Sequence, residues 1–248
     1  MKFIRLIGIC GLAGAAAVFS CFAAGENSPV GYWLFDEGNG KTISDSSGNN
    51  NHGKVANNMR AVTWVNGRNG KALQFSGCQT NRNQNGCVLI SNLAGKYNFE
   101  KGITIEAWIR PASSMERKAI YEIVTNTESD RGKGFRLRIA WNALMFGSGE
   151  GGDGRTWQAA SMPARAQIKS ETWYHIAGAY DGSVFRVYLD GEEVGASDPN
   201  LPLTRGRKDV YIGAYNEGYA YGFEGVIDEV KIYERALSAS EILEHSKL

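Results

Sequence analysis

Short segments in which apolar and polar side chains alternate recur along most of the chain. In residues 103–110 every second position carries Ile or Ala, the positions between them are mostly polar or aromatic, and Pro111 follows. A period of two places neighbouring side chains on opposite faces of a strand. We therefore expect a strand here with one face buried, ending at the proline.

A second alternating run covers residues 135–141. Apolar side chains occupy the odd positions through Trp141, and Arg136 and Arg138 lie between them. The pattern predicts a strand with one buried face, on which Trp141 shares the side of the apolar residues, while the two arginines lie on the other side.

The last complete strand is predicted within residues 223–233. Read with a period of two, Val226, Asp228, Val230 and Ile232 fall on one face, so that a carboxylate lies in an apolar row. Such a carboxylate is costly to bury unless a cation or hydrogen bonds compensate its charge.

Turn signals separate these segments at regular spacing. Asp-Gly pairs follow two predicted strands at residues 181–182 and 190–191, and the chain has 31 Gly and only 5 Pro. About a dozen short strands with such turns are typical of an antiparallel sandwich or barrel. One short helix is expected at the C-terminal end, because Ser238 and Glu241 form a capping box.

Composition and charge narrow the class of protein. The chain has 248 residues, of which 43% are hydrophobic and 21% charged, and its formal net charge is +1. This is an ordinary globular composition of a size that suits one all-β domain. The near-zero charge gives no electrostatic attraction to nucleic acid, so no nucleic-acid partner is expected.

The first 24 residues have the pattern of a signal peptide. Lys2 and Arg5 precede an apolar stretch at residues 6–19, which is too short to span a membrane. Cleavage after Ala23 is one interpretation; the alternative is a lipoprotein leader cut before Cys21, which would be the only membrane anchor. Both predict a secreted, periplasmic or cell-surface protein with a mature domain at residues 25–248.

Two cysteines lie outside this leader. Cys78 and Cys87 flank a polar loop rich in Asn and Gly. In an oxidising compartment this arrangement predicts a disulfide that closes the loop. Two thiols without a suitably spaced histidine make a poor metal site.

Several motifs together resemble one family. In order, they are residues 32–38 (YWLFDEG), 45–49 (DSSGN), 67–73 (GRNGKAL), 103–108 (ITIEAW), 173–177 (WYHIA), 188–191 (YLDG), 225–230 (GVIDEV) and 235–242 (RALSASEI). This ordered set is similar to laminin-G-like, concanavalin A-like domains of bacterial secreted proteins. The resemblance implies an all-β, two-sheet antiparallel jelly-roll sandwich whose first and last strands lie close together.

The resemblance also implies one structural calcium near the joined chain ends. Asp36, Asp45, Asn49 and Asp228 are the oxygen ligands that this sequence offers there. In the alternative interpretation, Asp45 and Asp228 only cap turns by accepting hydrogen bonds from backbone N–H groups.

Catalysis is the less favoured interpretation. Hydrolases of this fold carry alternating acidic residues along one strand, whereas Asp228 and Glu229 are adjacent and a regular strand points them to opposite faces. His175 matches a packing position of the family motif. A polysaccharide lyase or glycoside hydrolase with an unrecognised site stays an alternative, as does a protein-binding surface lipoprotein.

Binding is the function that the sequence favours. Residues 216–222 form a loop of aromatic and polar side chains, and such residues stack on sugar rings and bond their hydroxyls. The candidate ligand-binding residues, to which Trp141 could contribute a further ring, are Asn216, Tyr219, Tyr221, Arg138 and Trp157. We expect a lectin-like partnership with an extracellular polysaccharide or glycoprotein.

Overall fold

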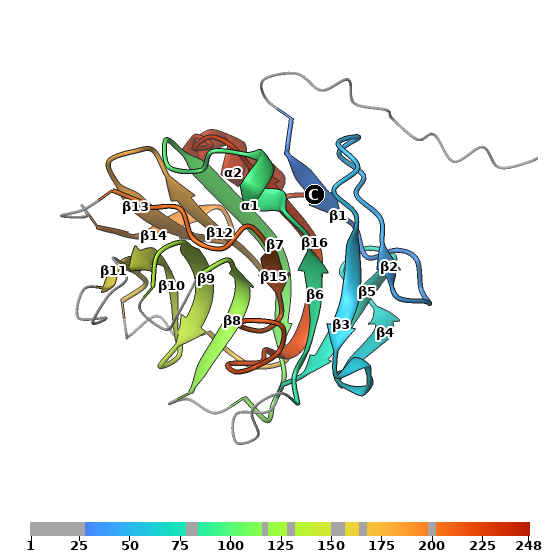
Figure 1. Cartoon of the computed structure of the whole chain (residues 1–248). Coiled ribbons are helices and arrows are strands. Elements are labelled where there is room, and N and C mark those ends of the chain that lie inside the picture. Colours follow the sequence, from blue (N-terminus) through green and yellow to red (C-terminus); the bar gives the residue numbers. More distant parts are fainter. Residues whose placement is uncertain are drawn as a thin grey trace, which may run out of the picture.

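Two antiparallel sheets face each other across one hydrophobic core. The computed structural model describes residues 28–77, 84–115, 119–127, 132–149, 157–163, 168–197 and 202–248. Within them each sheet has eight strands (Figure 1). The predicted all-β jelly-roll sandwich is thus confirmed, whereas the predicted leader, residues 1–24 with Cys21, lies outside the described residues.

The strands of each sheet pair in an order that differs from their order in the sequence. Sheet A contains β14 (Glu192–Ser197), β13 (Phe185–Leu189), β12 (Tyr174–Tyr180), β7 (Ile103–Pro111), β16 (Glu224–Tyr233), β5 (Lys71–Ser76) and β4 (Val62–Asn66), and β1 (Gly31–Trp33) also pairs with β16. Sheet B contains β11 (Trp157–Ser161), β10 (Ala143–Gly149), β9 (Phe135–Ala140), β8 (Ile120–Thr125), β15 (Val210–Ile212), β6 (Gly86–Ile90), β3 (Gly53–Asn57) and β2 (Thr42–Ile43).

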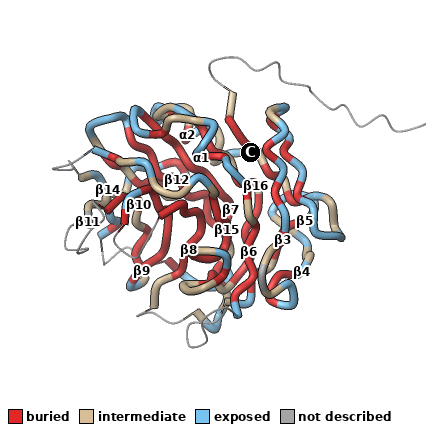
Figure 2. Tube along the Cα trace, in the orientation of Figure 1, coloured by how far each residue is buried: buried red, intermediate tan, exposed pale blue. Residues whose placement is uncertain are grey.

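The core fills the space between the sheets. Figure 2 shows buried chain along the central strands of both sheets, with exposure at turns and edges. In β7, Ile103, Ile105 and Ile109 belong to the core as predicted. The opposite face, predicted to be exposed, is also buried at Thr104, Glu106 and Trp108. Burial in the core contributes roughly 1.5–3 kcal/mol for each fully buried aliphatic side chain.

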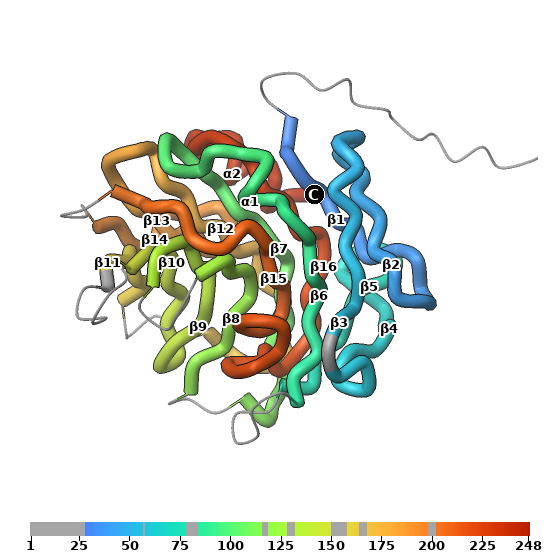
Figure 3. The backbone as a smooth tube through the Cα atoms, viewed as in Figure 1, coloured from blue at the N-terminus to red at the C-terminus, as the bar shows by residue number. Residues whose placement is uncertain are grey.

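The two ends of the described chain meet in sheet A. β1 pairs antiparallel with β16, with Gly31 opposite Ile232, and Figure 3 shows the blue N-terminal segment beside the red C-terminal one. This closure confirms the expected proximity of the first and last strands. Trp33 on β1 is fully buried, and its indole Nε1 donates to the carbonyl of Asn51 (2.9 Å).

A β-bulge in β16 changes which side chains face the core. The pairing with β7 shifts between Asp228 and Lys231, and Glu229 has a φ of 48°. The core-facing residues are Ile227, Val230 and Ile232. The prediction that Asp228 shares a face with Val230 and Ile232 is therefore wrong, because the extra residue reverses the alternation after position 228.

The second alternating run also differs from its prediction. Arg136 and Arg138 do face away from the core, but both are buried. Trp141 is not in the core: it lies in the two-residue turn between β9 and β10 and is 61% exposed. The alternation ends at Ala140 because Trp141 and Asn142 both have positive φ, which turns the chain.

The helices are short. α1 (Leu93–Lys96) and a 3-10 turn (Met59–Ala61) connect strands, and α2 (Ala239–His245) begins at Ser238 with the predicted capping box to Glu241. α2 packs its Ile242 on the outer face of sheet A, among Ala177, Tyr188 and Tyr233. None of the helices in the described ranges has the length and hydrophobicity that crossing a membrane requires.

Candidate functional site

The outer face of sheet B, which points away from sheet A, carries a buried ionic cluster. Phe135, Leu137 and Ile139 of β9 belong to the core, so the alternate residues Arg136 and Arg138 lie on the outer face. On the neighbouring strand, Glu122 of β8 pairs in register with Arg138. We refer to Glu122, Arg136 and Arg138 as the ionic cluster.

The ion pairs of this cluster are short and shielded. Arg136 Nη1 lies 3.3 Å and Arg138 Nη1 3.8 Å from Glu122 Oε1. Glu122 and Arg136 are fully buried, and Arg136 Nη2 also donates to Thr127 Oγ1. Charges removed from water in this way depend on one another, because neither partner could be solvated alone.

The 213–223 loop covers one side of the cluster. Glu122 N donates to the carbonyl of Tyr221 (2.9 Å), so the loop continues the sheet where β15 ends. The Arg136 guanidinium lies 5.6 Å from the ring centre of Tyr215, which is 6.1 Å from that of Tyr221. Two aromatic rings therefore border the buried charges.

The structure brings together some of the predicted ligand-binding residues. Arg138 belongs to the ionic cluster and Tyr221 adjoins it through Glu122. Asn216 and Tyr219 are half-buried in the same loop, joined by a bond from Tyr219 N to Asn216 O (3.1 Å). Trp157 starts β11 opposite Gly149, and its side chain lies outside the described part.

Three members of this site were not among the predicted ligand-binding residues. Glu122, Arg136 and Tyr215 are buried beside Arg138. One signal in the sequence could have indicated this cluster: Glu122 lies within the apolar run of residues 120–125. A carboxylate buried in such a run needs a cation beside it. The pairing of Glu122 with the arginines of β9 depends on strand order, which alternation alone does not give.

The candidate calcium ligand Asp45 is held by backbone donors. Its Oδ1 accepts from Tyr32 N (2.9 Å) and Ser47 N (2.9 Å), and its Oδ2 accepts from Asn51 N (2.8 Å). Asn49 lies in the same loop, where its Nδ2 donates to the carbonyl of Pro29 (3.1 Å). This group fixes the loop against β1.

The other two candidates surround the turn at residues 67–71. Asp228 Oδ2 accepts from Arg68 N (2.8 Å) and Asn69 N (3.4 Å), and its Oδ1 accepts from Glu229 N (2.9 Å). Asp36 Oδ1 accepts from Lys71 N (2.7 Å). Burial raises the pKa of Asp228 to about 7, because desolvation outweighs the three hydrogen bonds.

The four predicted ligands thus divide into two hydrogen-bonded groups, and the turn-capping contacts of the alternative interpretation are present. Among the described residues, no cluster of three or more His, Cys, Asp or Glu side chains could hold a metal ion. The residues therefore do not fit a calcium site built from carboxylates. Calcium also accepts backbone and amide oxygens, so the calcium prediction itself stays untested.

A histidine cluster lies on the outer face of sheet A. The carboxyl group of buried Glu106 lies between the two imidazoles. Its Oε2 is 2.9 Å from Nδ1 of His245, and its Oε1 is 3.8 Å from Nε2 of His175. Burial lowers the pKa of His175 to about 4, with Glu106 acting in the opposite direction. His175 packs against Trp108, as the family motif implies, and His245 helps to hold α2 on the sheet.

The structure describes only one of the two cysteines of the predicted disulfide, which therefore stays a prediction. Cys87 is a buried thiol without a disulfide partner in the described part of the chain, packed with Tyr211 and Ala214, and Cys78 lies outside the described residues. Burial raises the pKa of the Cys87 thiol to about 12. The prediction placed Cys87 in a surface loop, whereas it belongs to β6, where its side chain packs under Tyr211.

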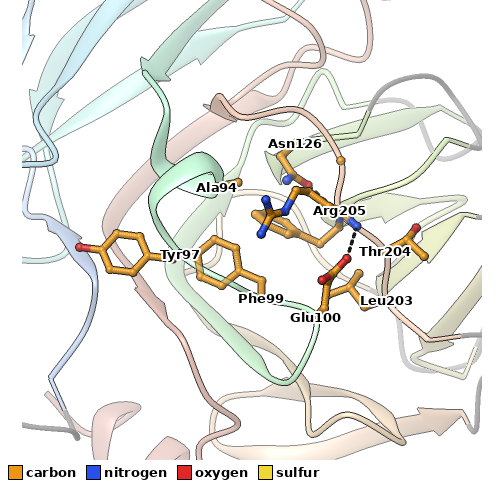
Figure 4. A pocket seen from close by; sticks show the side chains of 10 residues that line it. Ala94, Tyr97, Phe99, Glu100, Asn126, Leu203, Thr204 and Arg205 are labelled. Carbon is orange, nitrogen blue, oxygen red and sulfur yellow. Dashed lines mark hydrogen bonds between the residues drawn. The ribbon is translucent and has the colours of Figure 1, made fainter.

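A small cavity lies beside α1 (Figure 4). Phe99, Asn126, Leu203 and Arg205 are among its lining residues, and Arg205 N donates to Glu100 Oε1 (3.1 Å). Its volume of about 10 Å³ is the space of one water molecule. It cannot admit a sugar ring.

A larger, open cavity of about 470 Å³ lies on the outer face of sheet A beside α2, with Arg186, Tyr188 and Glu193 among its lining residues. The outer face of sheet B differs from both cavities in carrying the buried ionic cluster, and it is the candidate site for that reason.

The family follows from a comparison of sequences. The model of the concanavalin A-like lectin/glucanases superfamily matches residues 82–243. The chain belongs to this superfamily. No curated protein sequence matches the chain.

Solved structures share the superfamily fold at low identity. Domain 4 of AbnA, a GH43 extracellular arabinanase from Geobacillus stearothermophilus in complex with arabinotriose, is 19% identical with a TM-score of 0.60, covering 88% of this chain and 98% of that one. The binding domain of botulinum neurotoxin DC in complex with rat synaptotagmin II is 14% identical with a TM-score of 0.66, covering 90% and 52%.

The same toxin domain in complex with SialylT matches equally well, at 14% identity and a TM-score of 0.66 over 90% of this chain and 51% of that one. The 248-residue chain spans about half the length of the toxin binding domains that it matches. The likeness establishes the jelly-roll fold and leaves the ligand to be argued from the site.

Proposed function

We propose that the protein is a non-catalytic module that binds an extracellular carbohydrate on the outer face of sheet B. The observation that carries the proposal is the ionic cluster bordered by Tyr215 and Tyr221. Aromatic rings stack on the apolar faces of sugars, and arginine side chains donate to hydroxyl or carboxylate oxygens. Arg138, which is 6% exposed, is the cluster member nearest to solvent.

Relatives with known ligands support this class of partner. One solved relative holds arabinotriose, another holds SialylT, and cell entry of a third, botulinum neurotoxin type C, depends on interaction with two ganglioside molecules. The second candidate is a protein partner, favoured by the toxin domain bound to rat synaptotagmin II. Carbohydrate is the preferred class because the rings and charges on sheet B are the groups that recognise sugars.

The test is retardation of residues 25–248 in native gels that contain arabinan, xylan, polygalacturonate or a sialylated mucin. We expect retardation by at least one polymer. Arg138→Gln should weaken the affinity roughly 10–100-fold, because a charged hydrogen bond is lost. Arg186→Gln, a half-buried arginine that lines the cavity on sheet A, is the matched comparison and should leave retardation unchanged. A loss of retardation in Arg186→Gln but not in Arg138→Gln would place the binding site at that cavity instead.

Three results would contradict parts of this function. A polymer that is shorter after the gel run would identify an enzyme, and the alternative of a lyase or hydrolase would replace the binding module. If no polymer retards the protein, the carbohydrate function is wrong and the second candidate, a protein partner, is favoured. Equal retardation of wild type and Arg138→Gln would move the binding site away from the ionic cluster.

Export is a further part of the proposal. Lys2, Arg5 and the apolar stretch at residues 6–19 have the composition of a signal peptide. We place the mature domain outside the cytoplasm, either soluble or anchored by lipid at Cys21. Mass spectrometry of the mature N-terminus distinguishes the two, since only the anchored form begins with a diacylated Cys21.

The calcium prediction has its own measurement. If the Asp45 loop or the 67–71 turn binds calcium, excess CaCl₂ should raise the thermal midpoint by roughly 5–10 °C relative to EDTA, because a ligand at 100 times its Kd adds about 2.7 kcal/mol. MgCl₂ is the control, since magnesium prefers a smaller, octahedral site. Equal midpoints in CaCl₂ and EDTA would show that the protein holds no stabilising calcium.

A further inference from the structure

The turn between β9 and β10 presents an unusual tryptophan. Trp141 has a φ of 50° and the following Asn142 a φ of 65°. Trp141 is also 61% exposed. It is the one aromatic residue among the large hydrophobic side chains that are exposed in the described part of the chain. A bulky aromatic residue therefore occupies a left-handed position at the surface.

Both features cost stability. Two-residue turns with positive φ favour Asn-Gly or Asp-Gly, because glycine and asparagine tolerate the left-handed region and bulky side chains do not. An exposed indole, in addition, gains little from burial. Asn142 suits its position, and Trp141 does not.

Among the described residues, no hydrogen bond, ion pair or ring contact of the Trp141 side chain offsets this cost. The backbone N–H of Trp141 donates to the carbonyl of Ala119 (3.2 Å), a bond that any residue could make. Within the described ranges its indole makes no aromatic or cation–π contact. Strain at a binding surface is often retained for the contact that it makes with a ligand.

The position of the turn connects it to the ionic cluster. Trp141 lies in the turn that ends β9, three residues after Arg138, so their Cα atoms are at most roughly 11 Å apart. Arg138 pairs with Glu122, whose backbone N–H bonds to Tyr221. Tyr221 of the 213–223 loop thus lies on one side of Glu122 and Arg138 on the other, and Trp141 lies at the end of the strand that carries Arg138.

We propose that Trp141 is a stacking platform for a second sugar ring of the carbohydrate that binds at Arg138. An indole offers a wide apolar face and is rigid, with two rotatable bonds, so it loses little entropy when a ring packs on it. The ligand class is an oligosaccharide long enough to reach from Arg138 to Trp141 and with one ring that exposes an apolar face. This inference rests on the proposed function.

The test uses residues 25–248 and the same gels of arabinan, xylan, polygalacturonate and sialylated mucin. Trp141→Ala should weaken retardation about tenfold, whereas Trp141→Phe, which keeps an aromatic face, should stay within about threefold of wild type. Leu243→Ala is the control, because Leu243 is an exposed apolar residue of α2 on the sheet A side. It should bind as wild type does.

Stability and fluorescence separate a binding role from a structural one. Trp141→Asn places a residue that tolerates positive φ in the turn, so its thermal midpoint should equal or exceed that of wild type while its retardation is lost. Saturating polymer should protect wild-type fluorescence from iodide quenching. A lower midpoint in Trp141→Asn together with unchanged retardation would show a structural residue and overturn the inference.

The remaining outcomes distinguish the two proposals. If a polymer retards wild type and Trp141→Ala equally, the platform is refuted and the binding function stands. If no polymer retards wild type, the carbohydrate function fails and the platform fails with it. If Arg138→Gln and Trp141→Ala both lose retardation, and Leu243→Ala does not, both proposals are supported.

Discussion

Glu122→Gln is expected to lower the free energy of unfolding by about 3–5 kcal/mol. The substitution keeps the size of the side chain but removes its charge, which leaves the fully buried Arg136 without the carboxylate 3.3 Å away. A buried cation that loses its partner carries an uncompensated desolvation cost. Urea unfolding at neutral pH, followed by tryptophan fluorescence, measures the change.

Glu193→Gln is the matched control for this substitution. Glu193 also pairs with an arginine, Arg186 at 3.6 Å, but it is 43% exposed. Solvent screens such pairs, so its loss should cost less than about 1 kcal/mol. Equal urea midpoints for wild type and Glu122→Gln would show that Arg136 does not depend on Glu122.

Asp228→Ala is expected to lower the free energy of unfolding by about 3 kcal/mol. The carboxylate of Asp228 accepts bonds from the backbone N–H groups of Arg68, Asn69 and Glu229, and it thereby ties the 67–71 turn to the bulge in β16. Alanine provides no acceptor for these groups. Asp181→Ala, at an exposed turn on the same sheet, is a control that should cost less.

The effect of Asp228 should also depend on pH. The pKa of Asp228 in the folded protein is raised to about 7, whereas the pKa of an aspartate in the unfolded chain is about 4. The folded state therefore binds the proton more tightly. The part of the stabilisation that depends on the bound proton is fully present below pH ~4 and is lost as the pH rises to about 7.

Asp228→Ala should accordingly flatten the stability profile between about pH 4 and pH 7. Urea midpoints of wild type and variant, measured at intervals across this window, test the sign. A wild-type midpoint that rises with pH in this window, relative to that of Asp228→Ala, would contradict a raised pKa. It would show that the three N–H donors hold the carboxyl in its ionised form.

Local patterns were sufficient to predict the fold. The alternation in residues 103–110 gives the core face of β7 because strand period and burial act within a few residues. The capping box of α2 was predicted for the same reason, since Ser238 and Glu241 meet within one helical turn. The ordered family motifs then fixed the two-sheet jelly roll.

The candidate site was predicted only in part. Arg138 and Tyr221 were recognised by residue type, but Glu122, Arg136 and Tyr215 were not. Their positions depend on β8 lying between β9 and β15 in sheet B. Strand order is a property of long-range pairing, and alternation along one strand carries no information about it.

The amino-acid sequence by itself determined the strands, the turns, the C-terminal helix and the superfamily of this protein. Only the tertiary structure decided that Asp228 faces away from the core, that Cys87 is buried, and that Trp141 stands in solvent. A bulge, a buried neighbour and a turn cause these three differences. Each arises where one residue shifts the register or where distant strands meet, and local periodicity cannot encode either.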